Sequence, residues 1–63
     1  MSSFNELIEW SETEKRGLTI FIKGQTVAGV VVKVIAGEAI EVRSQTYSRV
    51  VIRLDSIDAM AAA

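Results

Sequence analysis

The stretch from Leu18 to Met60 constrains the fold most, because β-branched and aliphatic residues recur along it between short glycine-marked breaks. Leu18, Ile20 and Ile22 occupy alternate positions, which is the period of a strand with one buried face. The chain contains no proline that would interrupt a ladder of backbone hydrogen bonds. This stretch therefore predicts short antiparallel strands joined by tight turns.

The pattern predicts five strands. They cover residues 18–23, 26–35, 39–44, 49–54 and 57–60, with turns at Gly24, Ala36–Gly37 and Asp55–Ser56. The second strand contains Gly29, which indicates a bend or a close approach of another backbone. Its valine run at 30–32 places apolar side chains on both faces. We expect one face to fill a core and the other to lie under a helix or against a neighbouring subunit.

A short amphipathic helix is predicted before the first strand. Ser3 and Glu6 have the spacing of a capping box. The apolar stripe consists of Phe4, Leu7, Ile8 and Ser11. We expect the helix at about residues 4–15, with Gly17 at the C′ position. Trp10 flanks the stripe, and packing on the strands is favoured there over a role in base stacking or partner binding.

A helix followed by five strongly curved strands predicts one mainly β domain over residues 1–63. We expect a small antiparallel barrel at about residues 18–60 and a frayed tail at 61–63. A domain of 63 residues buries only about 60% of its unfolded surface. The sequence has no Cys and no His, so disulfides and a zinc site are excluded. Self-association through exposed strand edges is the remaining source of stability.

The net charge of −1 conceals an uneven distribution. Four of the eight acidic residues lie within the first 14 positions, so residues 15–63 carry seven basic residues against four acidic ones, a sum of +3. No apolar run is long enough to span a bilayer, and the acidic N-terminal segment does not match a signal peptide. We therefore expect a cytoplasmic protein that does not enter a membrane.

The residue types present do not favour catalysis. Without His or Cys, the nearest candidates are Asp55 and Asp58, whose spacing across a turn is typical of solvated carboxylates. Gly24 and Gly29 lack the Lys and Ser/Thr that complete a phosphate-binding loop. We expect no enzyme activity, no cofactor, no metal and no small-molecule substrate.

The exposed cations are the remaining candidates for a binding site. They are Lys23, Lys33, Arg43, Arg49 and Arg53. Most are expected to be solvated strand residues, but Arg53 is the last outward residue before the Asp55–Ser56 turn. If subunits surround an axis, copies of Arg53 converge there and can bind phosphate or stack on bases.

The order of elements and two short motifs resemble the Sm-like family, including its bacterial Hfq-like members. Gly24 and Gly29 have the five-residue spacing of the two glycines in the first Sm motif. The second motif, Ile-Arg-Gly-x-x-Ile, is matched by residues 52–57 at Ile52, Arg53 and Ile57. The resemblance covers nearly the whole chain. It implies a homo-oligomeric ring of six or seven subunits that binds single-stranded RNA at its pore.

The chain departs from the family at the positions that read RNA. Where the family has Asp-x-x-Met-Asn, this chain has residues 35–39, Ile-Ala-Gly-Glu-Ala, and Leu54 replaces the glycine that follows the motif arginine. Two hypotheses stay open. The first is a ring that binds single-stranded RNA with altered specificity, and its candidate residues are Arg53, Asp55, Gly37 and Lys23. The second is a structural or protein-interaction ring that retains the fold without the RNA site.

Overall fold

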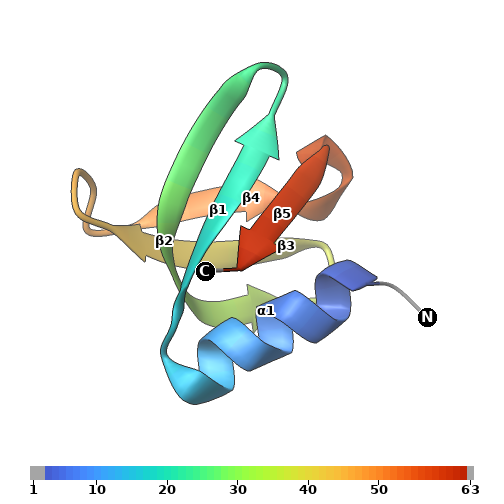
Figure 1. The fold of residues 1–63 in the computed structure, drawn as a ribbon. Coiled ribbons are helices and arrows are strands. Elements are labelled where there is room, and N and C mark those ends of the chain that lie inside the picture. Colours follow the sequence, from blue (N-terminus) through green and yellow to red (C-terminus); the bar gives the residue numbers. More distant parts are fainter. Residues whose placement is uncertain (1–2, 63) are drawn as a thin grey trace.

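The computed structural model describes residues 3–62 and consists of one helix followed by five strands. The elements are α1 (Ser3–Glu14), β1 (Gly17–Ile22), β2 (Gln25–Ile35), β3 (Ala39–Ser44), β4 (Val50–Arg53), the 3₁₀ helix η1 (Leu54–Ser56) and β5 (Ala59–Ala62). All strands are antiparallel and form one sheet in the order β4-β3-β2-β1-β5 (Figure 1). The predicted mainly β fold, with its N-terminal helix and five antiparallel strands, is confirmed.

Strand β2 joins two halves of the sheet that cross at a steep angle (Figure 1). Its first part pairs with β1 and its second part pairs with β3. Gly29 lies where the two ladders meet, and a Cβ atom there would be 2.5 Å from the Arg43 carbonyl oxygen. The close backbone approach expected at Gly29 is confirmed. It allows β2 to pair with β1 in one half of the sheet and with β3 in the other.

The core lies between the two halves of the sheet and under α1. Its buried members are Ile8, Leu18, Ile20, Val31, Ile40, Val42, Ile52 and Ile57. Leu18 and Ile20 are buried while Ile22 is half-buried, as the alternation predicted. Trp10 packs against this cluster, which supports the packing interpretation. The Cζ atom of Arg16 lies over the Trp10 ring, 5.7 Å from its centroid.

The valine run of β2 is divided by a β-bulge. Val31 pairs with Val42 and Lys33 with Glu41, so Val32 is an extra residue on the β2 side. Val31 is buried, whereas Val32 and Val34 are 39% and 43% exposed. This part of β2 is apolar except for Lys33. The core face is therefore covered as expected, and cover of the other face by a neighbouring subunit stays a prediction.

Ser11 connects α1 to the sheet. Its side chain is fully buried, and its Oγ accepts a hydrogen bond of 3.0 Å from the Val31 N–H. The same oxygen donates to the Arg16 carbonyl at 2.6 Å. The helix packs against β1, β2 and β5. Ser11 thus supplies a partner for a backbone N–H at the bulge, where the ladder is interrupted.

The helix ends at Glu14, close to the predicted residue 15, but its C′ residue is not the predicted one. Lys15, with φ of 57°, takes the left-handed C′ position, and the Arg16 N–H donates to the Ser11 carbonyl at 3.2 Å. This is the bond of a Schellman motif. The assignment of C′ to Gly17 is wrong, because Gly17 already pairs with Val30 as the first residue of β1. The capping box predicted at Ser3 lies outside the described side chains.

The last strand begins and ends later than predicted. Ile57 is buried against the core, and the Asp58 N–H donates to the Phe21 carbonyl at 2.8 Å before β5 starts. Residues 61 and 62, expected to fray, pair with Thr19 and Leu18 of β1. Ala63 lies outside the described residues. The backbone pairing of small alanines extends the strand where their side chains offer little apolar burial.

The sheet has two edges, β4 and β5, and these strands do not pair with each other within residues 3–62. Closure into a barrel therefore stays a prediction. At 12 residues α1 is too short to cross a bilayer, and the described chain holds no other helix with the length and apolarity to do so.

Candidate functional site

Two turns that are distant in sequence lie against each other at one end of β3 and β4. The Leu54 N–H donates to the Glu38 carbonyl at 2.9 Å, and Ala39 is the register partner of Arg53. We call residues 36–38 together with residues 53–55 the two-turn site. It contains three of the four candidate residues predicted from the sequence, namely Gly37, Arg53 and Asp55.

The β2–β3 turn has the geometry of a type I′ turn. The Glu38 N–H donates to the Ile35 carbonyl at 2.9 Å, and the two central residues, Ala36 and Gly37, have φ of 51° and 70°. Gly37 suits this left-handed position because it has no Cβ. The turn therefore holds the exposed Glu38 next to the start of η1.

Arg53 lies at the end of β4 and is largely exposed. Its Nη2 donates to Asp55 Oδ2 at 2.9 Å, and the two side chains are 76% and 68% exposed. An ion pair this exposed contributes about 0–1 kcal/mol, so a competing anion can displace Asp55. With Glu38 included, the site holds one cation and two carboxylates, a formal charge of −1.

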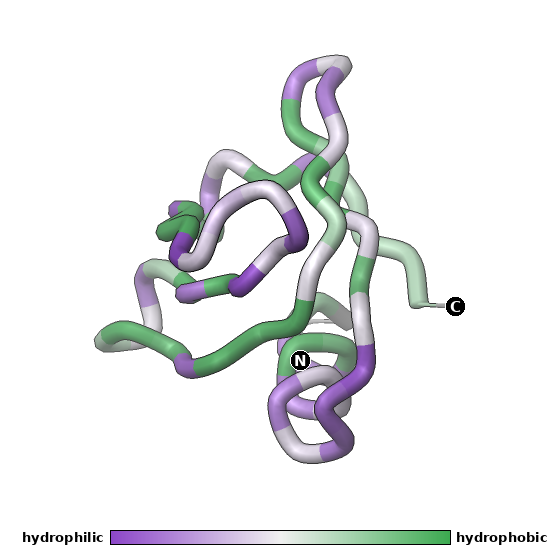
Figure 2. The backbone as a smooth tube through the Cα atoms, turned by 90° about the vertical axis from the view of Figure 1, so that its left-hand side faces the viewer, coloured by the Kyte–Doolittle hydropathy of each residue, from purple (hydrophilic) through white to green (hydrophobic). Residues whose placement is uncertain are grey.

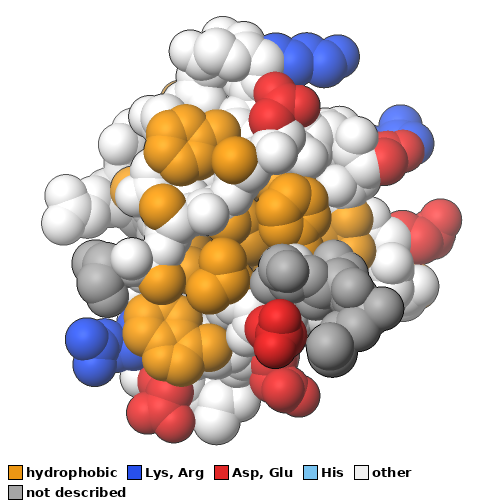
Figure 3. Space-filling view, turned by 45° about the vertical axis from the view of Figure 1, so that its right-hand side comes forward, with side chains coloured by type: hydrophobic (Ala, Val, Ile, Leu, Met, Phe, Trp, Pro, Cys, Tyr) orange, Lys and Arg blue, Asp and Glu red, His pale blue; other side chains and the backbone are white. Residues whose placement is uncertain are grey.

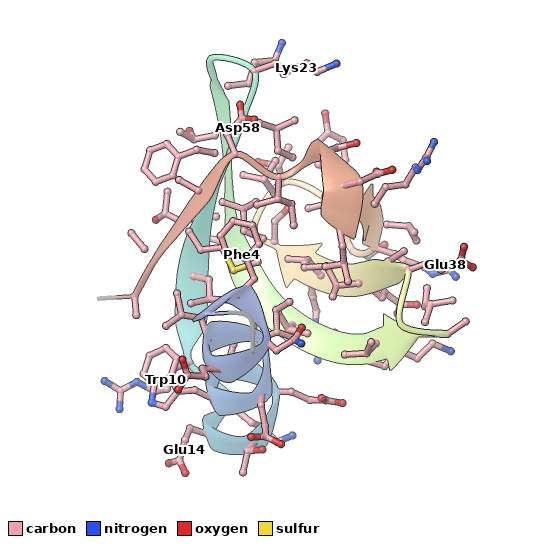
Figure 4. The ribbon with its side chains drawn as sticks, turned by 90° about the vertical axis from the view of Figure 1, so that its right-hand side faces the viewer. Phe4, Trp10, Glu14, Lys23, Glu38 and Asp58 are labelled. Atoms are coloured by element: carbon pink, nitrogen blue, oxygen red, sulfur yellow. The ribbon has the colours of Figure 1, made fainter. Side chains whose placement is uncertain are left out.

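Lys23 lies elsewhere, at the tip of the β1–β2 hairpin. Its backbone N–H donates to Asp58 Oδ2 at 2.8 Å. Figure 4 shows Lys23 and Asp58 together at the hairpin and Glu38 on another side of the molecule. The structure therefore does not bring Lys23 to the two-turn site. Asp58, one of the two carboxylates considered from the sequence, stabilises this hairpin by accepting that hydrogen bond.

A groove of about 840 Å³ lies between the first part of β2 and the β3–β4 loop. Its lining residues are Lys15, Gly17, Thr26–Val30, Arg43–Tyr47 and Val50. Figure 2 views the backbone from the side on which the β3–β4 loop lies in Figure 1. Sequence reasoning identified Arg43 as an exposed cation and Gly29 as a bend, but did not connect them. The groove depends on the path of β2 past the end of β3, which is a tertiary feature.

The chemistry available at the two-turn site is ionic and hydrogen-bonding. Within residues 3–62, no three carboxylates gather in a way that would hold a metal ion. A guanidinium beside backbone turns can bind a phosphate or stack on a base. Comparison of the chain with protein-family models, characterised proteins and solved structures finds no match.

Proposed function

We propose that this chain is an Sm-like subunit that assembles into a homo-oligomeric ring of six or seven copies and binds single-stranded RNA weakly at the pore. The observation that carries the proposal is the edge strand β5, Ala59–Ala62, which pairs with β1 on one side only among the described residues and contains no charged residue and no proline. Edge strands usually carry such residues to prevent pairing with another chain. An edge without them is suited to be an interface.

The second edge makes the pairing geometrically possible. Strands β4 and β5 each contain four residues and lie at opposite edges of one sheet. Pairing β4 of one copy with β5 of the next is a heterologous contact, which closes into a ring when its rotation allows. The partly exposed Val51, Val32 and Val34 add apolar surface that a neighbour would cover.

Apolar surface also gathers beside the β5 edge. Figure 3 shows hydrophobic side chains clustered on the face that carries α1 and β5, with carboxylates around them. Leu7 and Met60 are half-buried members of the core periphery, and Phe21 is 38% exposed. Burying such groups contributes about 25 cal/mol per Å². A 63-residue domain benefits from this additional burial.

RNA binding is placed at the two-turn site, with Arg53 as the phosphate or base contact. The adjacency of residues 36–38 and 53–55 supports this choice, because one ligand can touch both turns. In a ring the site is repeated around the axis, so weak contacts act together. Binding requires the ligand to replace Asp55 as the partner of Arg53. This exchange predicts modest affinity and a strong dependence on salt.

The alternative is a structural or protein-interaction ring that binds no RNA. Glu38 and Asp55 favour it, because they make the two-turn site formally negative and a phosphate backbone is repelled by that charge. The two functions share the ring and differ only in the ligand at the two-turn site.

Native mass spectrometry with and without short oligo-U and oligo-A RNA tests both parts. We expect hexamers or heptamers, and RNA-bound rings at low salt. Arg53→Gln is expected to remove the RNA-bound species, whereas Lys33→Gln, an exposed cation on β2, retains them. Rings that bind no RNA at low salt would favour the alternative. A monomer at micromolar concentration would refute the ring.

A pair of variants at Val51 tests the edge itself. Val51 is half-exposed, and its N–H faces the free edge of β4, because the alternation of an antiparallel ladder leaves Val50 and Ile52 bonded to β3. Val51→Pro removes that N–H and is expected to leave monomers, while Val51→Thr keeps it and retains the ring. Circular dichroism confirms that each variant is folded. Rings formed by a folded Val51→Pro would contradict pairing through β4.

A further inference from the structure

The groove beside β2 contains a third stretch of uncovered strand edge. Residues 25–30 of β2 pair with β1 on one side, but pairing with β3 begins only at Gly29. Within residues 3–62, no strand pairs with Thr26 or Ala28 on the side away from β1. Both residues line the groove and are exposed.

Hairpin geometry gives the direction of their backbone groups. Lys23 and Gly24 form a two-residue turn with φ of 47° and 82°, closed by the pair Ile22 and Gln25. The pair next to such a turn exchanges hydrogen bonds, and bonded pairs then alternate with non-bonded ones. Thr26 and Ala28 fall in the non-bonded pairs. Their N–H and C=O groups therefore point away from β1, toward the groove.

The charges along the groove have a single sign. Among the described residues, Lys15 and Arg43 line it, and no carboxylate side chain does. Neither cation has an ion pair within the described part of the chain. The groove is therefore complementary to a ligand that carries negative charge.

The opposite wall presents an aromatic ring from a braced loop. The Ser44 N–H donates to the Tyr47 carbonyl at 3.0 Å, and the Tyr47 N–H donates to Ser44 Oγ at 2.9 Å. Tyr47 is nonetheless 63% exposed. Val27 and Val50 supply apolar lining between the walls. The groove thus combines a free strand edge, an apolar floor, an exposed ring and two cations.

We propose that this groove binds an extended, acidic peptide segment of a partner protein, which adds as a strand to the free edge of β2 at Thr26 and Ala28. In strand addition, main-chain hydrogen bonds give affinity and alternate side chains give specificity. Glutamate or aspartate side chains of the peptide face Lys15 and Arg43, and an apolar residue between them lies over Val27. The groove volume is within the range of ligand sites.

This inference is independent of the proposed function. Ring assembly uses the β4 and β5 edges, and RNA is placed at the two-turn site, whereas the peptide uses β2 and the β3–β4 loop. Loss of peptide binding therefore leaves the oligomeric state and RNA binding unchanged, and failure of either proposal can be recognised separately.

The test is a titration of the ¹⁵N-labelled full chain with an N-acetylated, C-amidated peptide of sequence TEVEVET, followed by amide chemical shifts and hydrogen exchange. We expect the amides of Thr26 and Ala28 to shift and to gain protection. A matched peptide with lysine in place of each glutamate is expected to bind at least about fivefold more weakly. A third peptide, N-methylated at alternate residues, lacks the donors for β2 and is expected not to bind.

Protein variants separate charge from fold. Arg43→Gln is expected to weaken binding of the glutamate peptide by about twofold to fivefold, which is the effect of losing an exposed ion pair. Lys33→Gln, which changes a cation of β2 outside the groove, is expected to have no effect. Equal binding of the glutamate and lysine peptides overturns the proposal, as does an absence of shifts at millimolar peptide. Peptide-induced shifts confined to β4 or β5 overturn it as well. So does protection of Thr26 and Ala28 that rises with protein concentration alone, because a second copy then covers the groove.

Discussion

Replacing Ser11 with alanine tests how α1 is attached to the sheet. The substitution leaves the Val31 N–H without its 3.0 Å partner, and Val31 is only 2% exposed. An unsatisfied buried donor costs about 1–3 kcal/mol. The Arg16 carbonyl also loses its bond, but Arg16 is exposed and water can replace Ser11 there. Alanine recovers up to about 0.5 kcal/mol through its helix propensity. The expected net loss is about 0.5–2.5 kcal/mol in the free energy of unfolding.

Urea denaturation followed by Trp10 fluorescence measures this loss. Trp10 lies on the same helix and packs against the core, so its emission reports undocking of α1. Protein concentration is held fixed, because the stability of an oligomer depends on it. Ser48→Ala, at an exposed position of the β3–β4 loop, is the matched control and is expected to change stability by less than about 0.5 kcal/mol. An effect that small at Ser11 would refute the attachment.

Three further substitutions follow from local geometry. Gly29→Ala is expected to lower the free energy of unfolding, measured by urea denaturation, by at least about 2 kcal/mol, because its Cβ would lie 2.5 Å from the Arg43 carbonyl oxygen. Gly17→Ala is the control, because the nearest atom to a Cβ there is 3.9 Å away, and equal effects of the two substitutions would contradict the argument. Lys15→Gly is expected to raise the thermal midpoint, because glycine adopts the left-handed conformation of this position without steric strain; the expected net gain in the free energy of unfolding is about 0.5–1 kcal/mol. A lower midpoint would count against the Schellman assignment. Leu7→Ala is expected to cost about 1–2 kcal/mol, less than a fully buried leucine, and a surface-like effect would mean that this part of α1 does not dock.

The strands were predictable from sequence because their period depends on burial of one face. Leu18 and Ile20 alternate with exposed or half-buried neighbours, and that alternation is visible without coordinates. The end of α1 was not predictable in the same way. Gly17 has the residue type that favours a C′ position, but its pairing with Val30 recruits it into β1, so Lys15 takes the left-handed conformation. A tertiary contact here overrides a local preference.

The two candidate surfaces differ in how much of each could be predicted. Arg53 and Asp55 are adjacent in sequence, so their proximity needs no fold, and the family resemblance pointed to the same turn. The bond from Leu54 to Glu38 joins turns 16 residues apart and depends on the register of β3 and β4. The groove depends on more, because Lys15, Thr26 and Tyr47 come from three separate segments. Their sequence signals are ordinary polar residues in loops and strand ends.

The three uncovered edges arise from one structural cause. Because β2 bends at Gly29 to pair with β1 and then β3, its first part is left open beside the β3–β4 loop, and the sheet ends at β4 and β5 instead of closing. The edges are not equally protected. Strand β4 ends in Arg53, and the open part of β2 is bordered by Lys15 and Arg43, whereas β5 has no charged residue. Charge disfavours indiscriminate pairing and selects a complementary partner. We therefore expect the uncharged β5 to accept β4 of a neighbouring copy, and the edge of β2 between Lys15 and Arg43 to be left for a different, acidic partner.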